Sequence, residues 1–268
     1  MTPLIKEFRF LFWAILGVIV PFGFFLCFFP SSTHSYCAWV VPHPRSAMLI
    51  GAAYLGAIAY YSLVLKENDW SQTQNGMGGL IIFCVVLLIA TMAHWHQFRM
   101  YHITTLVWLI FYYVGPFMVP IAYRKQNALR TSFDGGKGTH TLGRAWRFLQ
   151  IGRGFFYITL AVFWLAMADA ICQIWPWPIE PLELRVFAGQ PAIIGWNAII
   201  ALSDRQQWRS HRLGLVLGGA IGFVQLVGLL VNSTPYNTAG VGIVLPLMFI
   251  EWTLTPLLMF IKHERKKS

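Results

Sequence analysis

The sequence predicts an all-α protein whose helices cross a membrane, about eight of them in two parallel four-helix repeats. Three observations support this fold. The chain of 268 residues is 57% hydrophobic and only 11% charged, whereas soluble domains are about a quarter charged. Its apolar residues fall in runs close to the roughly 20 residues that a bilayer helix needs. Two stretches far apart in the chain also share one pattern of proline, glycine and tryptophan.

Eight apolar segments qualify as spanning helices. The first follows Lys6 and Arg9, as a signal peptide would, but it is too long for a typical signal core and no small-residue cleavage site follows it. We therefore expect a retained helix. The sixth is interrupted by Pro191 and Asn197, so neighbouring helices would have to satisfy the backbone groups that the proline frees. In chain order the segments are 10–29, 46–65, 78–96, 104–123, 154–174, 186–203, 213–231 and 241–261.

Positive charge is confined to alternate loops. With the N-terminus inside, all but three of the 20 Lys and Arg residues fall on the inner side, and the exceptions are Arg45, Arg99 and Arg185. Cytoplasmic loops of membrane proteins carry this excess. We predict a multi-pass protein of the bacterial inner (plasma) membrane with both termini in the cytoplasm. The same bias accounts for the net charge of +10, so we expect lipid and no nucleic acid as a partner.

The repeat joins residues 42–70 to residues 181–208. Four helices per copy bring both copies in from the same side, so the repeats are parallel. The predicted units are 1–123, a basic cytoplasmic linker 124–153, and 154–268. The linker contains a glycine-rich turn around Lys137, whose spacing does not fit a P-loop. The matched pairs, all at one offset, are Gly51 with Gly189, Trp70 with Trp208, and Gly76 with Gly214.

Two carboxylates are candidate ion or proton sites. Glu251 falls in mid-helix, where an ionisable group is costly and needs a partner or a proton. The alternative is a protonated or hydrogen-bonded packing contact. Asp169 falls near the outer surface, where it can form a structural salt bridge with Arg185 or Arg45. A proton relay with Glu251 is the other interpretation.

Histidines at the end of the third segment are candidate cofactor ligands. His94 and His96 stand close to Arg99 and His102, and imidazole can ligate heme, a chlorin or a metal. On a helix, residues i and i+2 point about 200° apart, so the two cannot readily share one ion. Either could still be a single axial ligand. The alternative is a polar belt at the membrane surface.

Two arginines stand at near-equivalent helix starts. Arg45 and Arg185 either anchor and position these helices at the outer face or form a basic pocket for an anion. The small residues that follow them, among them Gly51 and Gly189, let helices approach closely.

The four cysteines show no metal-binding spacing. Cys84 lies in an apolar run and is expected in the core. A disulfide between two of Cys27, Cys37 and Cys172 is an open alternative at the outer face.

Several short motifs carry a resemblance to a known group of proteins. The chain resembles a family of uncharacterised multi-pass bacterial membrane proteins with tandem four-helix repeats. This resemblance implies the fold and no established activity. The motifs are Pro44-Arg45, Gly51-Ala-Ala-Tyr54-Leu-Gly56-Ala, Ala90-Thr-Met-Ala-His94 with Phe98, and Trp175-Pro-Trp-Pro178 with Pro181, Arg185 and Trp208.

Three functions from different classes remain open. The first is an accessory or scaffold subunit of a larger membrane complex, with protein partners or self-association in the membrane. The second is a transporter of ions or small solutes that uses Glu251 at the repeat interface. The third is a heme- or chlorin-binding protein that uses His94 or His96. No catalytic triad, zinc-protease motif or nucleotide fingerprint is present. The sequence therefore assigns no catalytic residue, no metal and no particular cofactor, and it disfavours an enzyme.

Overall fold

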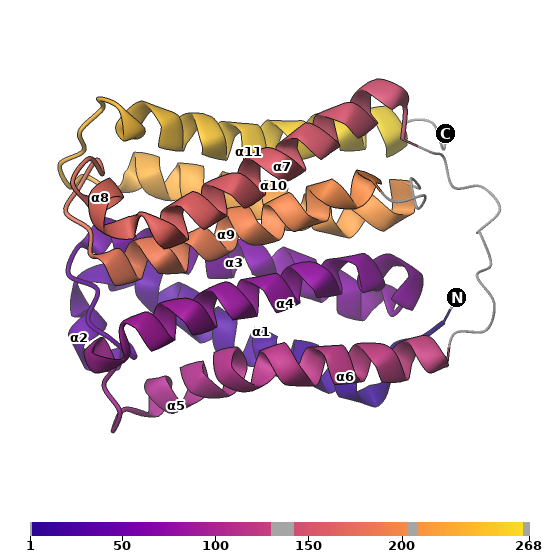
Figure 1. The fold of residues 1–268 in the computed structure, drawn as a ribbon, viewed down its shortest axis with the longest axis horizontal. Helices are drawn as coiled ribbons and strands as arrows, with labels where there is room; N and C mark the ends of the chain where they lie inside the picture. The colour runs from indigo at the N-terminus through magenta and orange to yellow at the C-terminus, as the bar shows by residue number, and fades with distance from the viewer. Residues whose placement is uncertain (1, 130–141, 203–207, 265–268) are drawn as a thin grey trace.

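The protein is a bundle of long helices that run side by side (Figure 1). The computed structural model describes residues 2–129, 142–202 and 208–264, and in these ranges every regular element is helical. The all-α fold is therefore confirmed. The predicted glycine-rich turn around Lys137 lies outside the described residues. The long helices are α1 (Lys6–Phe28), α3 (Pro44–Glu67), α4 (Trp70–Ala93), α5 (Ile103–Leu109) continued by a π-helical turn η3 (Ile110–Val114) and α6 (Gly115–Ala128), α7 (Arg144–Ala166), α9 (Pro181–Ile199), α10 (Trp208–Val231) and α11 (Val241–Glu264).

Seven of these helices are long and apolar enough to cross a membrane. They include Ile103–Ala128 as one span across the π-helical turn. The remaining long helix is α9, the predicted sixth span, which carries Glu183, Arg185, Gln190 and Asn197. Nearly all of its 19 residues are nevertheless buried. It is a polar-containing helix shielded by its neighbours.

Two helices begin well before their predicted starts. Helix α4 begins at Trp70 instead of residue 78, and α7 begins at Arg144 instead of residue 154. The added turns carry polar side chains such as Gln72, Gln74 and Gln150, all of which are buried. A hydropathy pattern assigns such residues to loops, but here packing against other helices covers them.

Local signals set the boundary between α3 and α4. Asn68 ends α3 in the left-handed region, with φ of 46°, a conformation that asparagine tolerates better than most residues. Asp69 then caps α4, and its carboxylate accepts from the backbone N–H of Ser71 at 3.1 Å. This pair turns the chain in two residues.

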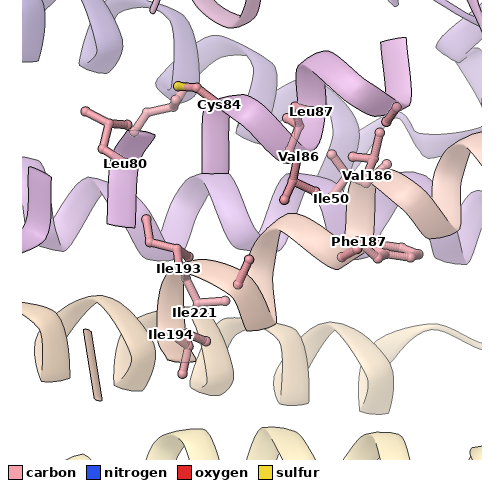
Figure 2. Packing of buried hydrophobic residues seen from close by; sticks show 14 of the residues in the cluster. Ile50, Leu80, Cys84, Val86, Leu87, Val186, Phe187, Ile193, Ile194 and Ile221 are labelled. Carbon is pink, nitrogen blue, oxygen red and sulfur yellow. The ribbon is translucent and has the colours of Figure 1, made fainter. Parts of the chain in front are cut away.

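Packing follows one scheme in both halves of the chain. Helix α1 packs on α3 as α7 packs on α9, and α4 packs on α6 as α10 packs on α11. Between the halves, α4 packs on α9 as α10 packs on α3. Side chains of α4 and α9 interleave at this interface (Figure 2), among them Leu80, Leu87, Val186 and Ile193.

Helix starts are spaced in the same way in the two halves. The interval from Lys6 of α1 to Arg144 of α7 equals that from Trp70 to Trp208 and that from Ile103 to Val241. The starts of α3 and α9 depart from it by one residue.

The tryptophan pair has matching surroundings. The Trp70 ring meets Tyr123 near the end of α6, at 5.3 Å between centroids. The Trp208 ring meets Phe260 near the end of α11, at 5.1 Å. Both tryptophans are buried, at 1% and 3% exposure. Both rings pack inside the protein at the ends of these helices.

The start of α1 and the end of α11 lie at one end of the bundle, here named the terminal end (Figure 1). The opposite, distal end carries two short helices, α2 (Thr33–Tyr36) and α8 (Ala168–Cys172). At the terminal end the segment before α1 is pinned in place. Asn68 accepts from the Leu4 N–H at 3.1 Å, and Gln126 accepts from the Ile5 N–H at 2.7 Å.

Candidate functional site

An apolar cavity of about 130 Å³ lies among the helices of the first half and is closed on one side by α9 and α10 of the second half. Its walls are built almost entirely from hydrocarbon and aromatic side chains. An apolar cavity of roughly 150 Å³ stays dry and accepts small apolar guests, so this space has room for a ring or a short stretch of hydrocarbon chain. Lining residues include Ile15, Ile19 and Phe22 of α1, Ala53, Tyr54 and Ala57 of α3, Leu80, Cys84 and Leu87 of α4, Trp108 and Tyr112 near η3, Val186, Gln190 and Ile193 of α9, and Leu217 and Ile221 of α10.

The π-helical turn forms one wall of the cavity. Pro116 follows η3 and has no N–H, so the regular hydrogen bond of that turn cannot form. Pro116 therefore cannot donate to the Tyr112 carbonyl, whereas the preceding Gly115 N–H bonds to the carbonyl of Phe111, four residues earlier. Turns of this kind widen a helix locally and occur often at functional sites. Here the widened turn contributes Phe111 and Tyr112 to the cavity lining.

A few polar groups meet this apolar space. The hydroxyls of Tyr54 and Tyr112 lie near each other. The Gln190 carbonyl accepts from the Gln225 amide at 2.6 Å, which leaves the Gln190 amide nitrogen as a donor. Binding sites for small molecules combine mostly apolar walls with a small number of such groups.

One side of the cavity is bounded by helices that share no main packing interface. Helix α1 packs on α3, and α6 packs on α4, whereas α1 and α5 are not principal neighbours among the described helices. The lining residues on this side, Val18, Phe22, Val107 and Phe111, are only partly buried. The cavity therefore lies behind a thin wall that faces the surroundings of the bundle.

The second half contains an ion pair between α7 and α11. Arg153 Nε of α7 lies 2.6 Å from Glu251 Oε1 of α11. Tyr157 donates to Glu251 Oε2 at 2.5 Å, and Thr255 donates to Oε1 at 2.8 Å. Arg153 also donates to Gln150 at 3.0 Å. Glu251 thus has a full set of partners, as a carboxylate at this depth requires.

Arg153 and Tyr157 were not among the predicted site residues. The sequence placed Arg153 in the cytoplasmic linker, because basic residues before an apolar run usually mark its inner end. Their spacing of i and i+4 puts both side chains on one face of α7. This spacing, together with the need of Glu251 for a partner, is the sequence feature that could have identified Arg153 and Tyr157 as site residues.

The distal end brings three of the other predicted residues, His94, Asp169 and Arg185, into one linked cluster. Arg185 of α9 donates to Asp169 Oδ2 at 2.9 Å and to the Leu165 carbonyl at 3.1 Å. Its Nη1 lies 2.6 Å from Nε2 of His94. Burial and the neighbouring guanidinium lower the pKa of His94, so Nε2 is an acceptor at neutral pH.

His96 does not join this cluster, and its ring centroid lies 6.4 Å from that of His94. No group of three or more metal-ligating side chains occurs in the described residues. A heme or chlorin on His94 through Nε2 would have to displace Arg185.

Arg45 is 2% exposed and serves the end of another helix. Its guanidinium donates to the carbonyl oxygens of Leu229 at 3.1 Å, Asn232 at 3.0 Å and Thr234. A cation at the C-terminus of α10 satisfies carbonyls that have no partner within the helix. Arg45 and Arg185 thus have different surroundings, and both guanidinium groups are engaged.

All four cysteines are free thiols. Cys84 is buried, as predicted, and lines the cavity.

A scan against protein-family models gives no match for this chain, and searches of curated proteins and of solved structures give none either.

Proposed function

We propose that this protein binds one apolar chain or ring of a lipid-class molecule in the cavity of its first half. The observation that carries the proposal is the apolar cavity of about 130 Å³ behind the thin wall between α1 and α5. The volume suits part of a lipid, so the remainder would extend into the bilayer. The Gln190 amide and the pair of Tyr54 and Tyr112 would orient a ligand that carries a hydroxyl or carbonyl group.

The setting of this activity is a membrane-embedded helical bundle. We infer that the terminal end faces the cytoplasm, since Lys and Arg concentrate there, and that the membrane is the bacterial inner membrane. We also infer a duplicated architecture, with units 1–123 and 154–268 joined by the segment 124–153. The matching packing scheme and helix spacing support duplication.

The glycine pairs support this duplication unequally. A Cβ on Gly76 would meet Tyr60 of α3, and one on Gly214 would meet Asn197 of α9, which are similar places. Gly51 faces α1, whereas its partner Gly189 faces α4. The offset therefore matches some contacts and not others.

The three functions predicted from sequence bear on this proposal in different ways. An accessory subunit that holds a lipid for a larger complex is compatible with it. Transport through Glu251 requires Arg153 to release the carboxylate that it now holds. Cofactor binding through His94 requires Arg185 to move. Lipid binding requires neither change.

Native mass spectrometry of the protein extracted gently from its own membrane tests the proposal. The wild type is expected to retain an additional mass of lipid size. Ala53→Phe would fill the cavity and remove that mass. Ala59→Phe is the matched control, because Ala59 lies on the same helix but is exposed, and it is expected to keep the mass.

Equal retention by both variants, or no added mass on the wild type, would contradict lipid binding. Whole additional chains in the spectrum would support the accessory-subunit setting.

A further inference from the structure

Glu183 is a buried carboxyl group for which the structure provides no cation. It stands in the first turn of α9, is 1% exposed, and neither of its oxygens has a hydrogen-bond partner in the described part of the chain. Glu251, the carboxyl of the ion pair in the second half, has an arginine and two hydroxyls as partners. The two groups therefore differ in what stabilises them.

The arginines closest to Glu183 in the sequence and on the facing helix are engaged elsewhere. Arg185 is held by Asp169, His94 and the Leu165 carbonyl. Arg45 caps the end of α10. Neither forms an ion pair with Glu183 in the described residues. An ionised carboxylate in this place would be an uncompensated buried charge, which is costly enough that such groups usually become neutral.

The nearest groups that act on Glu183 supply no positive charge, and one of them, Glu180, is a second carboxyl. Ser46 of α3, which is 0% exposed, lies beside the Glu183 carboxyl. The Ser46 hydroxyl oxygen accepts from Trp177 Nε1 at 2.9 Å. The Cys172 thiol on α8 is neutral, because burial raises its pKa to about 11. The remaining titratable or charged groups on the elements around this place are His43, Arg45, Asp169 and Arg185.

We propose that Glu183 is a proton-binding site whose carboxyl stays protonated while the distal ends of α3 and α9 are packed together as in this structure. Release of the proton to water then requires those helix ends to part. Glu183 also lies on the same face of α9 as Val186, Gln190 and Ile193, which line the cavity. Proton release would thus place a negative charge next to the distal end of the cavity.

Infrared difference spectroscopy on the full-length protein in detergent tests this site. The wild type at neutral pH is expected to show the C=O stretching band of a protonated carboxylic acid. Glu183→Gln should lose that band. Glu180→Gln is the matched control, because Glu180 lies one turn away and is exposed, and it should keep the band. An unchanged band in Glu183→Gln would overturn the proposal.

Thermal unfolding as a function of pH gives a second readout. The melting temperature of the wild type is expected to fall as the pH rises through the neutral range, because the unfolded chain releases this carboxyl proton at a lower pH than the folded protein does. Glu183→Gln keeps the neutral shape of the site and should not show this fall. If the melting temperature of the wild type instead rises when Na⁺ or K⁺ is added at high pH, the site binds a metal cation, and the proposal that it binds a proton is overturned.

If Glu183→Gln does not fold, the wild-type spectrum decides alone. Absence of a protonated-carboxyl band at neutral pH would then reject the proposal, and its presence, with loss on raising the pH, would support it. These results do not depend on lipid binding in the cavity, so the two proposals can fail separately.

Discussion

The two halves of the bundle use one helix-packing scheme but fill their interiors differently. Arg153 and Tyr157 of α7 match Ile15 and Ile19 of α1 at the offset that relates Trp70 to Trp208. In the second half these positions hold the ion pair with Glu251. In the first half the two isoleucines line the cavity. The same arrangement of helices can therefore hold either a buried ion pair or an apolar cavity.

Aromatic side chains contribute to the same difference. In the second half Trp164 meets Trp175 at 5.4 Å between ring centroids, and Trp175 stacks on Phe187. The space beside them is only about 10 Å³. Large rings thus fill the interior that the first half leaves open, and we expect the second half to supply rigidity and the first half to supply the binding space.

The largest expected effect comes from breaking the ion pair of the second half. Glu251→Gln leaves Arg153, which is 8% exposed, without a counter-charge, and the expected loss of stability is about 2–4 kcal/mol. Thermal unfolding in detergent measures it. The control is Glu7→Gln in the first half, which breaks the exposed pair of Glu7 with Lys125 and should cost much less stability, because water screens an exposed pair. Equal losses of stability in the two variants would show that the pair of Glu251 with Arg153 stabilises the protein no more than an exposed pair does.

A matched pair of leucine substitutions probes the interior space directly. Ala57 lines the cavity, and Gly195 is its counterpart in the second half. A Cβ on Gly195 would lie 2.9 Å from the backbone nitrogen of Ile158. Gly195→Leu should therefore lose about 1–3 kcal/mol from overpacking, whereas Ala57→Leu should be neutral or stabilising. Unfolding temperatures of the two variants provide the comparison, and equal destabilisation would argue against usable space in the first half.

The smallest expected effect concerns the link between the halves at the distal end. Below the ordinary histidine pKa of about 6.5, the unfolded chain binds a proton that folded His94 resists, because its pKa is lowered. Stability should therefore decline as the pH falls below that value and level off once folded His94 is protonated. His94→Gln should reduce this dependence. His96→Gln, which alters an exposed side chain, should leave it unchanged. Chemical unfolding at several pH values measures the slope.

Sequence reasoning predicted the fold well where hydropathy alone decides the structure. The apolar runs identified the long helices, because a bilayer requires continuous apolar segments of fixed length. It misplaced the starts of α4 and α7, because buried Gln72, Gln74 and Arg153 resemble loop residues until their neighbours are known. Hydropathy alone also describes α9 poorly, because the polar side chains of this helix are covered by other helices.

The candidate sites could be predicted only in part. The need of Glu251 for a partner followed from its depth, but the identity of Arg153 depended on which helix lies opposite. The cavity could not be predicted from the sequence, because isoleucine and alanine line a cavity as readily as they fill a packed core. Glu183 was missed because a carboxylate in the first turn of a helix is usually an ordinary N-terminal residue.

The crossed pairing of α4 with α9 and of α3 with α10 has a consequence for biosynthesis. When the first four spans have entered the membrane, the faces of α3 and α4 that meet the later helices are still uncovered. One of them carries Gly56, where a Cβ would lie 2.6 Å from the Ile221 backbone, so α10 packs closely against α3 there. The first half therefore completes its packing only after the second half has been inserted. Two halves that are expressed as separate chains should then associate in the membrane and form the intact bundle.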